Sequence, residues 1–256
     1  MTVLRVGLTR GATLLGIGLL SVGCTVVTGG KAQPPSRLTP RSLTGQTITQ
    51  VLIGDQTLSR ILKQPFVIDS RLPPRFGGPE TLQDLGSSSP TDCLGVAEML
   101  HQSVYGASKV NDVAVETWRH AALPAHLTSI KEGVVSLPTA ADANALFSTF
   151  AQQWQSCDGQ TVLLPDDVFR LKADITNVQV APSVLAGTVS IAFESGPSGP
   201  ASIPAGRAIG VRGNCLVEVE VDFFNESSRS MQGSSATNAT AFDIAHLMMD
   251  RVSALS

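Results

Sequence analysis

Cysteine and histidine are the side chains in this sequence best suited to metal or redox chemistry, and there are four of each. The cysteines form no CxxC pair, and no histidine stands at a spacing typical of a zinc ligand set. We therefore expect no metal site and no thioredoxin-type motif. The eight residues are Cys24, Cys93, Cys157, Cys215, His101, His120, His126 and His246.

The segment before Cys24 has the layout of a bacterial export signal. Arg5 and Arg10 form a basic start, and a short apolar run follows from residue 12 to 22. Gly23-Cys24 then resembles the lipobox of bacterial lipoproteins. This resemblance implies cleavage after Gly23 and attachment of diacylglycerol to the Cys24 sulfur, which anchors the protein in the membrane.

We therefore predict a signal peptide at residues 1–23, a tether at 24–44 and a folded domain at 45–256. The tether is rich in Gly, Pro, Ser and Thr and lacks a sustained apolar period, which is typical of an extended, solvated segment. The predicted location is the extracytoplasmic side of the cell membrane, held by lipid. Two alternatives remain: a plain signal peptide with Cys24 unmodified, or a membrane-spanning helix, which the many glycines disfavour.

Carboxylates that could do acid–base chemistry occur in two groups. Asp166-Asp167 lies in a predicted turn, where aspartate bonds to its own backbone. Glu218, Glu220 and Asp222 alternate with valines along a predicted strand. This alternation predicts one buried face and one solvated acidic face. The alternative is an acidic wall that binds a cationic ligand.

Nucleophilic and nucleotide-dependent catalysis find no support in the motifs. A serine hydrolase needs a GxSxG elbow, and the chain has only Gly196-Pro197-Ser198-Gly199 in a proline-rich loop. The HRD and DFG motifs of kinases are absent, and Gly16 and Gly18 fall within the signal segment. We expect no catalytic residues, no cofactor and no enzymatic activity; an envelope hydrolase using the scattered histidines is a remote alternative.

Two tryptophans could line a binding site or fill a core. Trp154 has the position of a core residue on a predicted helix. Trp118 is followed by Arg119 and His120 at the end of a predicted strand. It is our candidate for the rim of a ligand cleft, with an ordinary edge residue as the alternative.

Composition limits the partners of the chain. Its 256 residues suffice for one large domain, 43% are hydrophobic, and the net charge is −3 at pH 7. A mildly acidic chain lacks the basic surface that nucleic-acid binding needs. We expect no nucleic-acid partner.

Hydrophobic periodicity predicts the elements that position these residues. One helix broken at Gly54-Asp55, or two short ones, precede a Pro/Gly-rich loop over 69–89. Helices are predicted from residue 90 to 105, over 140–155 and over 239–255. Strands are predicted at 112–118, at 130–137 with an irregularity at 131–133, and in an antiparallel meander at 161–164, 168–180, 186–193, 207–211 and 215–224.

Several of these blocks together resemble the PknH-like extracellular sensor domain, the exported part of a mycobacterial serine/threonine kinase that also occurs in stand-alone lipoproteins. The resemblance spans roughly residues 45 to 255. It rests on Ser89-Pro90-Thr91-Asp92-Cys93-Leu94-Gly95, Val104-Tyr105-Gly106, Gly133-Val134-Val135, the run from Phe150 to Cys157, and the strand from Cys215 to Asn225.

The resemblance implies an α+β fold: an antiparallel sheet flanked by helices, with a cleft, in a domain that senses or binds without catalysis. Cys93 and Cys157 match the first disulfide pair of that family. Cys215 matches one member of the second pair, and its partner is missing from this sequence. We expect Cys215 to be a buried, unreactive thiol.

The function predicted from the sequence is a lipid-anchored, exported, non-catalytic domain that binds a small-molecule, lipid or protein ligand in a cleft. A lipid carrier or lipid-presenting lipoprotein with an apolar cavity is the main alternative. The sequence does not identify the ligand, the pocket residues, the protein partner or the oligomeric state.

Overall fold

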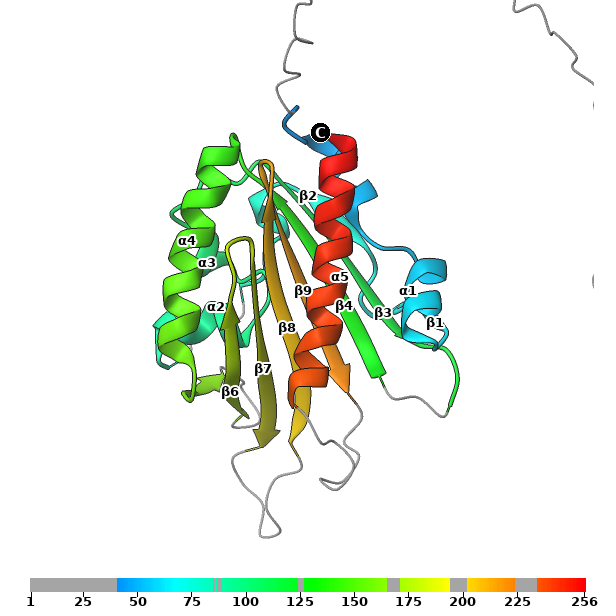
Figure 1. Cartoon of the computed structure of the whole chain (residues 1–256), viewed down its shortest axis with the longest axis vertical. Helices are drawn as coiled ribbons and strands as arrows, with labels where there is room; N and C mark the ends of the chain where they lie inside the picture. Colours follow the sequence, from blue (N-terminus) through cyan, green and yellow to red (C-terminus); the bar gives the residue numbers. More distant parts are fainter. Residues whose placement is uncertain are drawn as a thin grey trace, which may run out of the picture. The chain divides into compact units, whose positions relative to one another are not determined.

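In the part of the chain that the computed structural model describes (residues 41–84, 86, 89–123, 127–164, 171–193, 202–223 and 234–256), nine strands form one antiparallel sheet (Figure 1). The main strand order is β1-β3-β4-β9-β8-β7-β6-β5, and β2 pairs with β3. The strands are β1 (Phe66–Ile68), β2 (Arg75–Gly77), β3 (Asp112–His120), β4 (Leu127–Ser136), β5 (Thr161–Leu164), β6 (Leu171–Val180), β7 (Val184–Phe193), β8 (Ile203–Arg212) and β9 (Cys215–Phe223).

The predicted meander is confirmed: β5 to β9 pair in chain order, and β4 then pairs with β9. The turn between β8 and β9 contains Gly213 at φ +55°, a left-handed conformation that glycine adopts without steric cost. The irregularity predicted at residues 131–133 is wrong. Pairing is regular there, and the register shift of β4 lies between Leu127 and Ser129.

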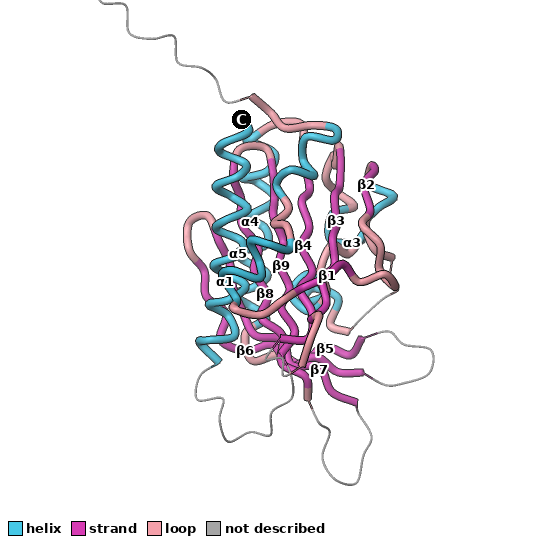
Figure 2. Tube along the Cα trace, turned by 90° about the vertical axis from the view of Figure 1, so that its right-hand side faces the viewer, coloured by secondary structure: helices cyan, strands magenta, loops and turns pink. Residues whose placement is uncertain are grey.

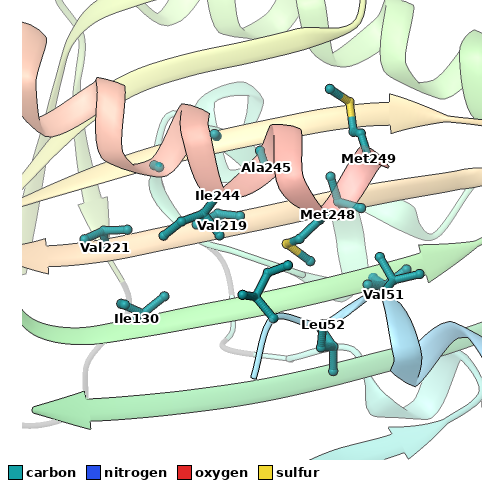
Figure 3. Close-up of a cluster of buried hydrophobic side chains, with 14 of the residues drawn as sticks. Val51, Leu52, Ile130, Val219, Val221, Ile244, Ala245, Met248 and Met249 are labelled. Carbon is teal, nitrogen blue, oxygen red and sulfur yellow. The ribbon is translucent and has the colours of Figure 1, made fainter. Parts of the chain in front are cut away.

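Helix α5 (Ser234–Leu255) lies along one face of the sheet, together with a 3-10 helix η1 (Gly45–Val51) and α1 (Asp55–Leu62). The two elements before β1 are therefore separate. Figure 3 shows how Ile244, Ala245 and Met248 of α5 meet valines of β9, with Val51 and Leu52 of the η1 segment beside them. Met249 comes so close to Gly210 that a Cβ there would lie 2.6 Å from its sulfur.

The opposite face carries a second core beneath η3 (Thr91–Cys93), α2 (Leu94–Ala97), α3 (Gln102–Tyr105) and α4 (Ala140–Cys157). Thr139 caps α4 by accepting a hydrogen bond from the Asp142 amide at 3.1 Å. Phe147, Phe150 and Trp154 point from α4 into this core, as predicted for a helix at 140–155. Figure 2 shows α5 and α1 on one side of the strands and α3 on the other. The predicted α+β architecture, a sheet flanked by helices, is confirmed.

The single helix predicted from residue 90 to 105 is wrong, because the chain unwinds between α2 and α3. Gln83 donates to the carbonyl of Leu100 at 2.9 Å and accepts from the amide of Gln102 at 2.7 Å. Backbone groups engaged with Gln83 cannot make helical bonds, and Leu100 itself adopts φ +57°. Gln83 belongs to the segment predicted as a plain loop, which also contains β2 and a 3-10 turn η2 (Pro79–Thr81).

The folded unit begins slightly before the predicted boundary at residue 45. Leu43 is buried, its amide donates to Asn214 Oδ1 at 2.8 Å, and its carbonyl accepts from Asn214 Nδ2 at 2.9 Å. The described residues between 41 and 256 form one compact unit, and both hydrophobic cores lie within it. The predicted signal peptide, most of the tether and Cys24 lie outside the described residues. Among the helices that are described, none has the length and apolarity needed to cross a bilayer.

Candidate functional site

Strand β9 is buried on both faces, which corrects the prediction of a solvated acidic face. Val217, Val219 and Val221 pack under α5. On the other face Glu218 is only 2% exposed, and Glu220 is half-buried. The alternation was real, but a second layer of helices covers part of the face that carries the carboxylates.

Arg207 of β8 neutralises these buried carboxylates. Its guanidinium is fully buried, with Nη2 3.0 Å from Glu218 Oε2 and Nη1 3.1 Å from Glu220 Oε2. Nη2 also donates to the carbonyls of Gly95 and Glu98, each at 3.4 Å. A charge removed from water in this way needs both a counter-ion and hydrogen bonds, and Arg207 has both.

Glu218 also ties α2 and α3 to the sheet. The Tyr105 hydroxyl donates to its Oε1, and the Leu100 amide donates to the carboxylate at 3.3 Å. Burial raises the pKa of Glu218, while Arg207 and these two hydrogen bonds oppose that rise. Burial and the Glu218 charge together raise the pKa of Tyr105. The neutral phenol is thus held as a donor, and we call Arg207, Glu218 and Tyr105 the polar clamp.

Gly133 is the point on β4 where the cover formed by α2, α3 and the residues between them contacts the strand. A Cβ at Gly133 would lie 2.6 Å from Leu100 Cδ1 and 3.0 Å from Met99 Cε. Glycine therefore lets the unwound segment between α2 and α3 lie flat on the strand. The helical cover does not extend over the next residues of the same face, Lys131 and Ser129.

An open groove occupies this uncovered part of the sheet. A cavity of about 330 Å³ is lined by the segment from Arg71 to Arg75, by Gln83, and by Val115, Thr117 and Lys131 of β3 and β4. A second hollow of about 530 Å³ shares Arg71 with it and is lined by Asp69, Ser70, Arg119, His120, Thr128 and Ser129. Because Thr117 pairs with Lys131 and Arg119 with Ser129, the two hollows are consecutive rows of one sheet face. We call them together the β3–β4 groove.

The groove is rich in unpaired positive charge. Asp69 binds Arg71 through two hydrogen bonds, at 2.9 and 2.6 Å, and this pairing holds the pKa of Asp69 at about 2. In contrast, Arg75, Arg119 and Lys131 make no ion pair with any residue that the structure describes. Burial lowers the pKa of Lys131, since its ammonium is largely removed from water.

A third hollow lies elsewhere, on the helical surface beside α4. Its volume is about 640 Å³, and its lining includes Val104, Lys109, Leu137, Leu146 and Thr149. It lacks the sheet floor and the group of cations that distinguish the β3–β4 groove. All three hollows are open and partly polar.

Trp118 does not line the groove, contrary to our prediction for a cleft rim. It is 6% exposed and belongs to the hydrophobic core on the face of the sheet opposite the groove, where η1 contacts β3. Its neighbours Thr117 and Arg119 point to the opposite face, because successive strand residues alternate between the faces. It is not the edge residue of the alternative either, because it is buried and pairs with Ile68 of β1 on one side and Ile130 of β4 on the other.

The cysteines occupy the places that the resemblance implies. Cys93 and Cys157 form a disulfide with their Cα atoms 5.6 Å apart, which joins η3 to the end of α4. Cys215 is a free, buried thiol, and burial raises its pKa to about 12, so it is not a reactive thiolate at neutral pH. Within the described residues, no three His, Cys, Asp or Glu side chains converge on a position that could hold a metal ion. His126, Asp166, Asp167 and Ser198 lie outside the described residues.

Sequence reasoning missed the groove residues because they come from segments with no clear pattern. Arg71 and Arg75 lie in the segment predicted as a loop, and Lys131 in the stretch predicted to be irregular. The one available signal was the alternation of Thr117 and Arg119 with buried residues on β3. Only the pairing of β2, β3 and β4 brings the cations together.

Comparisons with known proteins agree with this architecture. The family model of the PknH-like extracellular domain matches residues 43–251. The crystal structure of the extracellular domain of PknH from Mycobacterium tuberculosis is similar, with a TM-score of 0.65 and 18% identity, over 83% of this chain and 98% of that one. An uncharacterized protein from Mycobacterium smegmatis aligns over 81% of this chain and 96% of its own, with 11% identity and a TM-score of 0.39. No curated protein matches the chain.

Proposed function

This chain belongs to the PknH-like extracellular domain family, and on that premise we propose that it is a lipid-anchored, exported, non-catalytic domain that binds a ligand in the β3–β4 groove. The family consists of extracellular domains, and this chain lacks the HRD and DFG motifs of a kinase catalytic domain. Binding is therefore the activity that this domain retains. The anchor is the Cys24 lipid inferred from the lipobox-like residues before it.

The observation that carries the proposal is the unfilled groove beside a tightly packed core. Its volume falls in the range of small-molecule sites, and it combines a rigid sheet floor with a few polar groups and an apolar wall. The polar clamp and Gly133 hold α2, α3 and the residues between them against the sheet, and this supports a groove with a fixed shape. A preformed site of this kind lowers the entropic cost of binding.

The test is native mass spectrometry of residues 41–256, the unit that contains both cores, exported by a mycobacterial host and compared with its denatured mass. A groove-filling Thr117→Phe variant is measured beside Thr149→Phe, which places the same bulk in the hollow on α4. We expect additional non-covalent mass on the wild type and on Thr149→Phe, and none on Thr117→Phe.

Extra mass that persists in a folded Thr117→Phe variant would place the ligand outside the groove and refute the proposal. The proposal would also be refuted if the wild type carried no extra mass and no fraction of a cell-envelope extract raised its melting temperature. Native gels and circular dichroism of the two variants establish that both remain folded.

A further inference from the structure

The chemistry of the ligand can be inferred from the charges that line the groove; the inference rests on the function proposed above. Arg75 and Lys131 come from different strands and converge on the same cavity. Burial lowers the pKa of Lys131 most, and the charges of Arg207 and Arg75 lower it further, while those of Glu220 and Glu218 raise it. Neither makes an ion pair with a residue that the structure describes, and two cations placed together in this way favour the binding of an anion.

Asp69, Glu220 and Asp222, the acidic side chains along the groove, each have another bonding partner. Asp69 is bound by Arg71, and Glu220 by the buried Arg207. Asp222 accepts a short hydrogen bond from Ser129, and burial raises its pKa to about 6. Glu220 does act on Lys131 through space, but its closest partner is Arg207. The sequence left open an acidic wall for a cationic ligand, but its carboxylates, Glu218, Glu220 and Asp222, are all bonded to other side chains.

The remaining lining indicates what the anion is attached to. Thr117 and Gln83 offer hydrogen-bonding groups on the floor and side of the cavity, while Leu72, Pro73 and Val115 form an apolar wall. Leu72 stays 55% exposed, so the wall reaches the mouth of the cavity. Arginine forks bind the oxygens of phosphate in a planar, bidentate manner, and lysine adds a compact point charge.

We infer that the β3–β4 groove binds its ligand through a phosphate ester, with Lys131, Arg75 and Arg71 around the phosphate oxygens and a compact, partly apolar body against Leu72 and Val115. Arg71 keeps its hydrogen bonds to Asp69 and offers the remaining N–H groups of its guanidinium to the phosphate. The same headgroup chemistry occurs in soluble phosphate esters and in anionic phospholipids, and the experiment separates these two sources.

The test is an NMR titration of ¹⁵N-labelled residues 41–256, which lack Cys24 and so cannot bind membranes through the proposed lipid. The soluble probe is glycerol 3-phosphate, with glycerol as its uncharged match. The membrane probe is phosphatidylcholine vesicles with and without phosphatidylglycerol. We expect shifts of the Thr117 and Lys131 amides with the phosphate probes and none with glycerol or pure phosphatidylcholine.

Two charge-removing variants and two matched controls assign the site. Lys131→Met and Arg75→Gln each remove one groove cation and should raise Kd at least about tenfold, the loss expected for one charge-assisted contact. Lys109→Met and Arg212→Gln remove the same charges outside the groove and should change Kd less than about twofold. Arg75 is exposed, so its variant tests the inference even where Lys131→Met alters stability.

Binding of glycerol 3-phosphate supports a soluble phosphate ester as the ligand, and binding of phosphatidylglycerol vesicles alone supports a lipid headgroup. Phosphate probes that leave the groove unshifted, or binding that survives both groove variants, would overturn the inference. A neutral or cationic molecule found in the groove by mass spectrometry would do the same and leave the proposed function intact. If mass spectrometry found no ligand and the groove amides shifted with none of the probes, both the proposed function and the phosphate inference would be refuted.

Discussion

Glu132 shows at the scale of one residue how an acid can be built into a core. It is fully buried on the face beneath α5, where its Oε2 accepts a hydrogen bond from the Ile53 amide at 2.9 Å. Its Oε1 and the Trp118 indole nitrogen both lack a partner with hydrogen-bond geometry, although Trp118 is near enough to lower the pKa of Glu132. Burial dominates and raises that pKa to about 8, so the folded state holds Glu132 protonated at neutral pH.

Replacing this acid with its neutral isostere should therefore stabilise the protein at neutral pH. A folded-state pKa above the ordinary 4.5 means that stability is full below pH 4.5 and is lost as pH rises toward 8. Glu132→Gln carries no proton to lose, so its free energy of unfolding should exceed that of the wild type by roughly 2–3 kcal/mol at pH 7. Urea unfolding at several pH values between 4.5 and 8 measures the difference.

The surface variant Glu80→Gln is the control and should follow the wild-type profile. Some pH dependence should remain in Glu132→Gln, because burial also raises the pKa of Glu98, to about 7. Curves for Glu132→Gln and the wild type that run parallel across this range would show that Glu132 is ionised in the folded protein.

At the scale of elements, the short helices α2 and α3 are placed by bonds to other segments rather than by their own periodicity. Each has four residues, too few to be stable alone. Glu218 holds them from the sheet, Gln83 pairs with the backbone between them, and the Cys93–Cys157 disulfide fixes their start to α4. This cover bounds the groove, so its attachment matters for the site.

Removing the disulfide should lower stability through the entropy of the unfolded chain. The bond closes a loop with a sequence separation of 64 residues, which corresponds to about 4 kcal/mol on the chain-entropy estimate. We expect Cys93→Ser/Cys157→Ser to unfold at correspondingly lower urea concentration than the oxidised wild type. Dithiothreitol should bring the wild type to the variant's value and leave the variant unchanged. Equal stability of the variant and the oxidised wild type would show that the clamp contacts suffice.

At the scale of the whole molecule, one sheet separates two hydrophobic cores, and the helical layers cover its two faces unequally. Helices α5, α1 and η1 cover the face that holds Trp118 and Glu132. The layer formed by α2 to α4 covers the other face only in part and leaves the groove over β3 and β4. The site is thus a consequence of incomplete cover over a continuous sheet.

Attachment to the membrane is the prediction that concerns the chain as a whole. In a bacterium that processes lipoproteins, the full-length chain should incorporate alkyne-palmitate and partition into Triton X-114. Cys24→Ser should abolish both, because the proposed acceptor thiol is lost. Cys215→Ser is the control and should keep both, since that thiol is buried. Lipid label that persists on Cys24→Ser would refute anchoring through Cys24.

The sequence by itself determined the local elements and the family. Alternation in the meander, the apolar face of residues 140–155 and the blocks around Cys93 and Cys157 are encoded within short stretches. From them the sheet, α4 and the family could be predicted. The elements β1, β2, α2 and α3 have three or four residues each and carry too few periods to be recognised, whereas the equally short β5 was predicted as part of the meander.

Tertiary structure alone decided which charges are buried, and where the groove lies. Arg207 and Glu218 are distant from Tyr105 and Leu100 in sequence, and only strand register and the folded cover bring them together. Arg75 and Lys131 meet for the same reason, and Trp118 faces the core because η1 packs on that side of β3. Periodicity shows which residues share a face of a strand or helix. The packing of distant elements decides whether that face contacts a helix, a ligand or water.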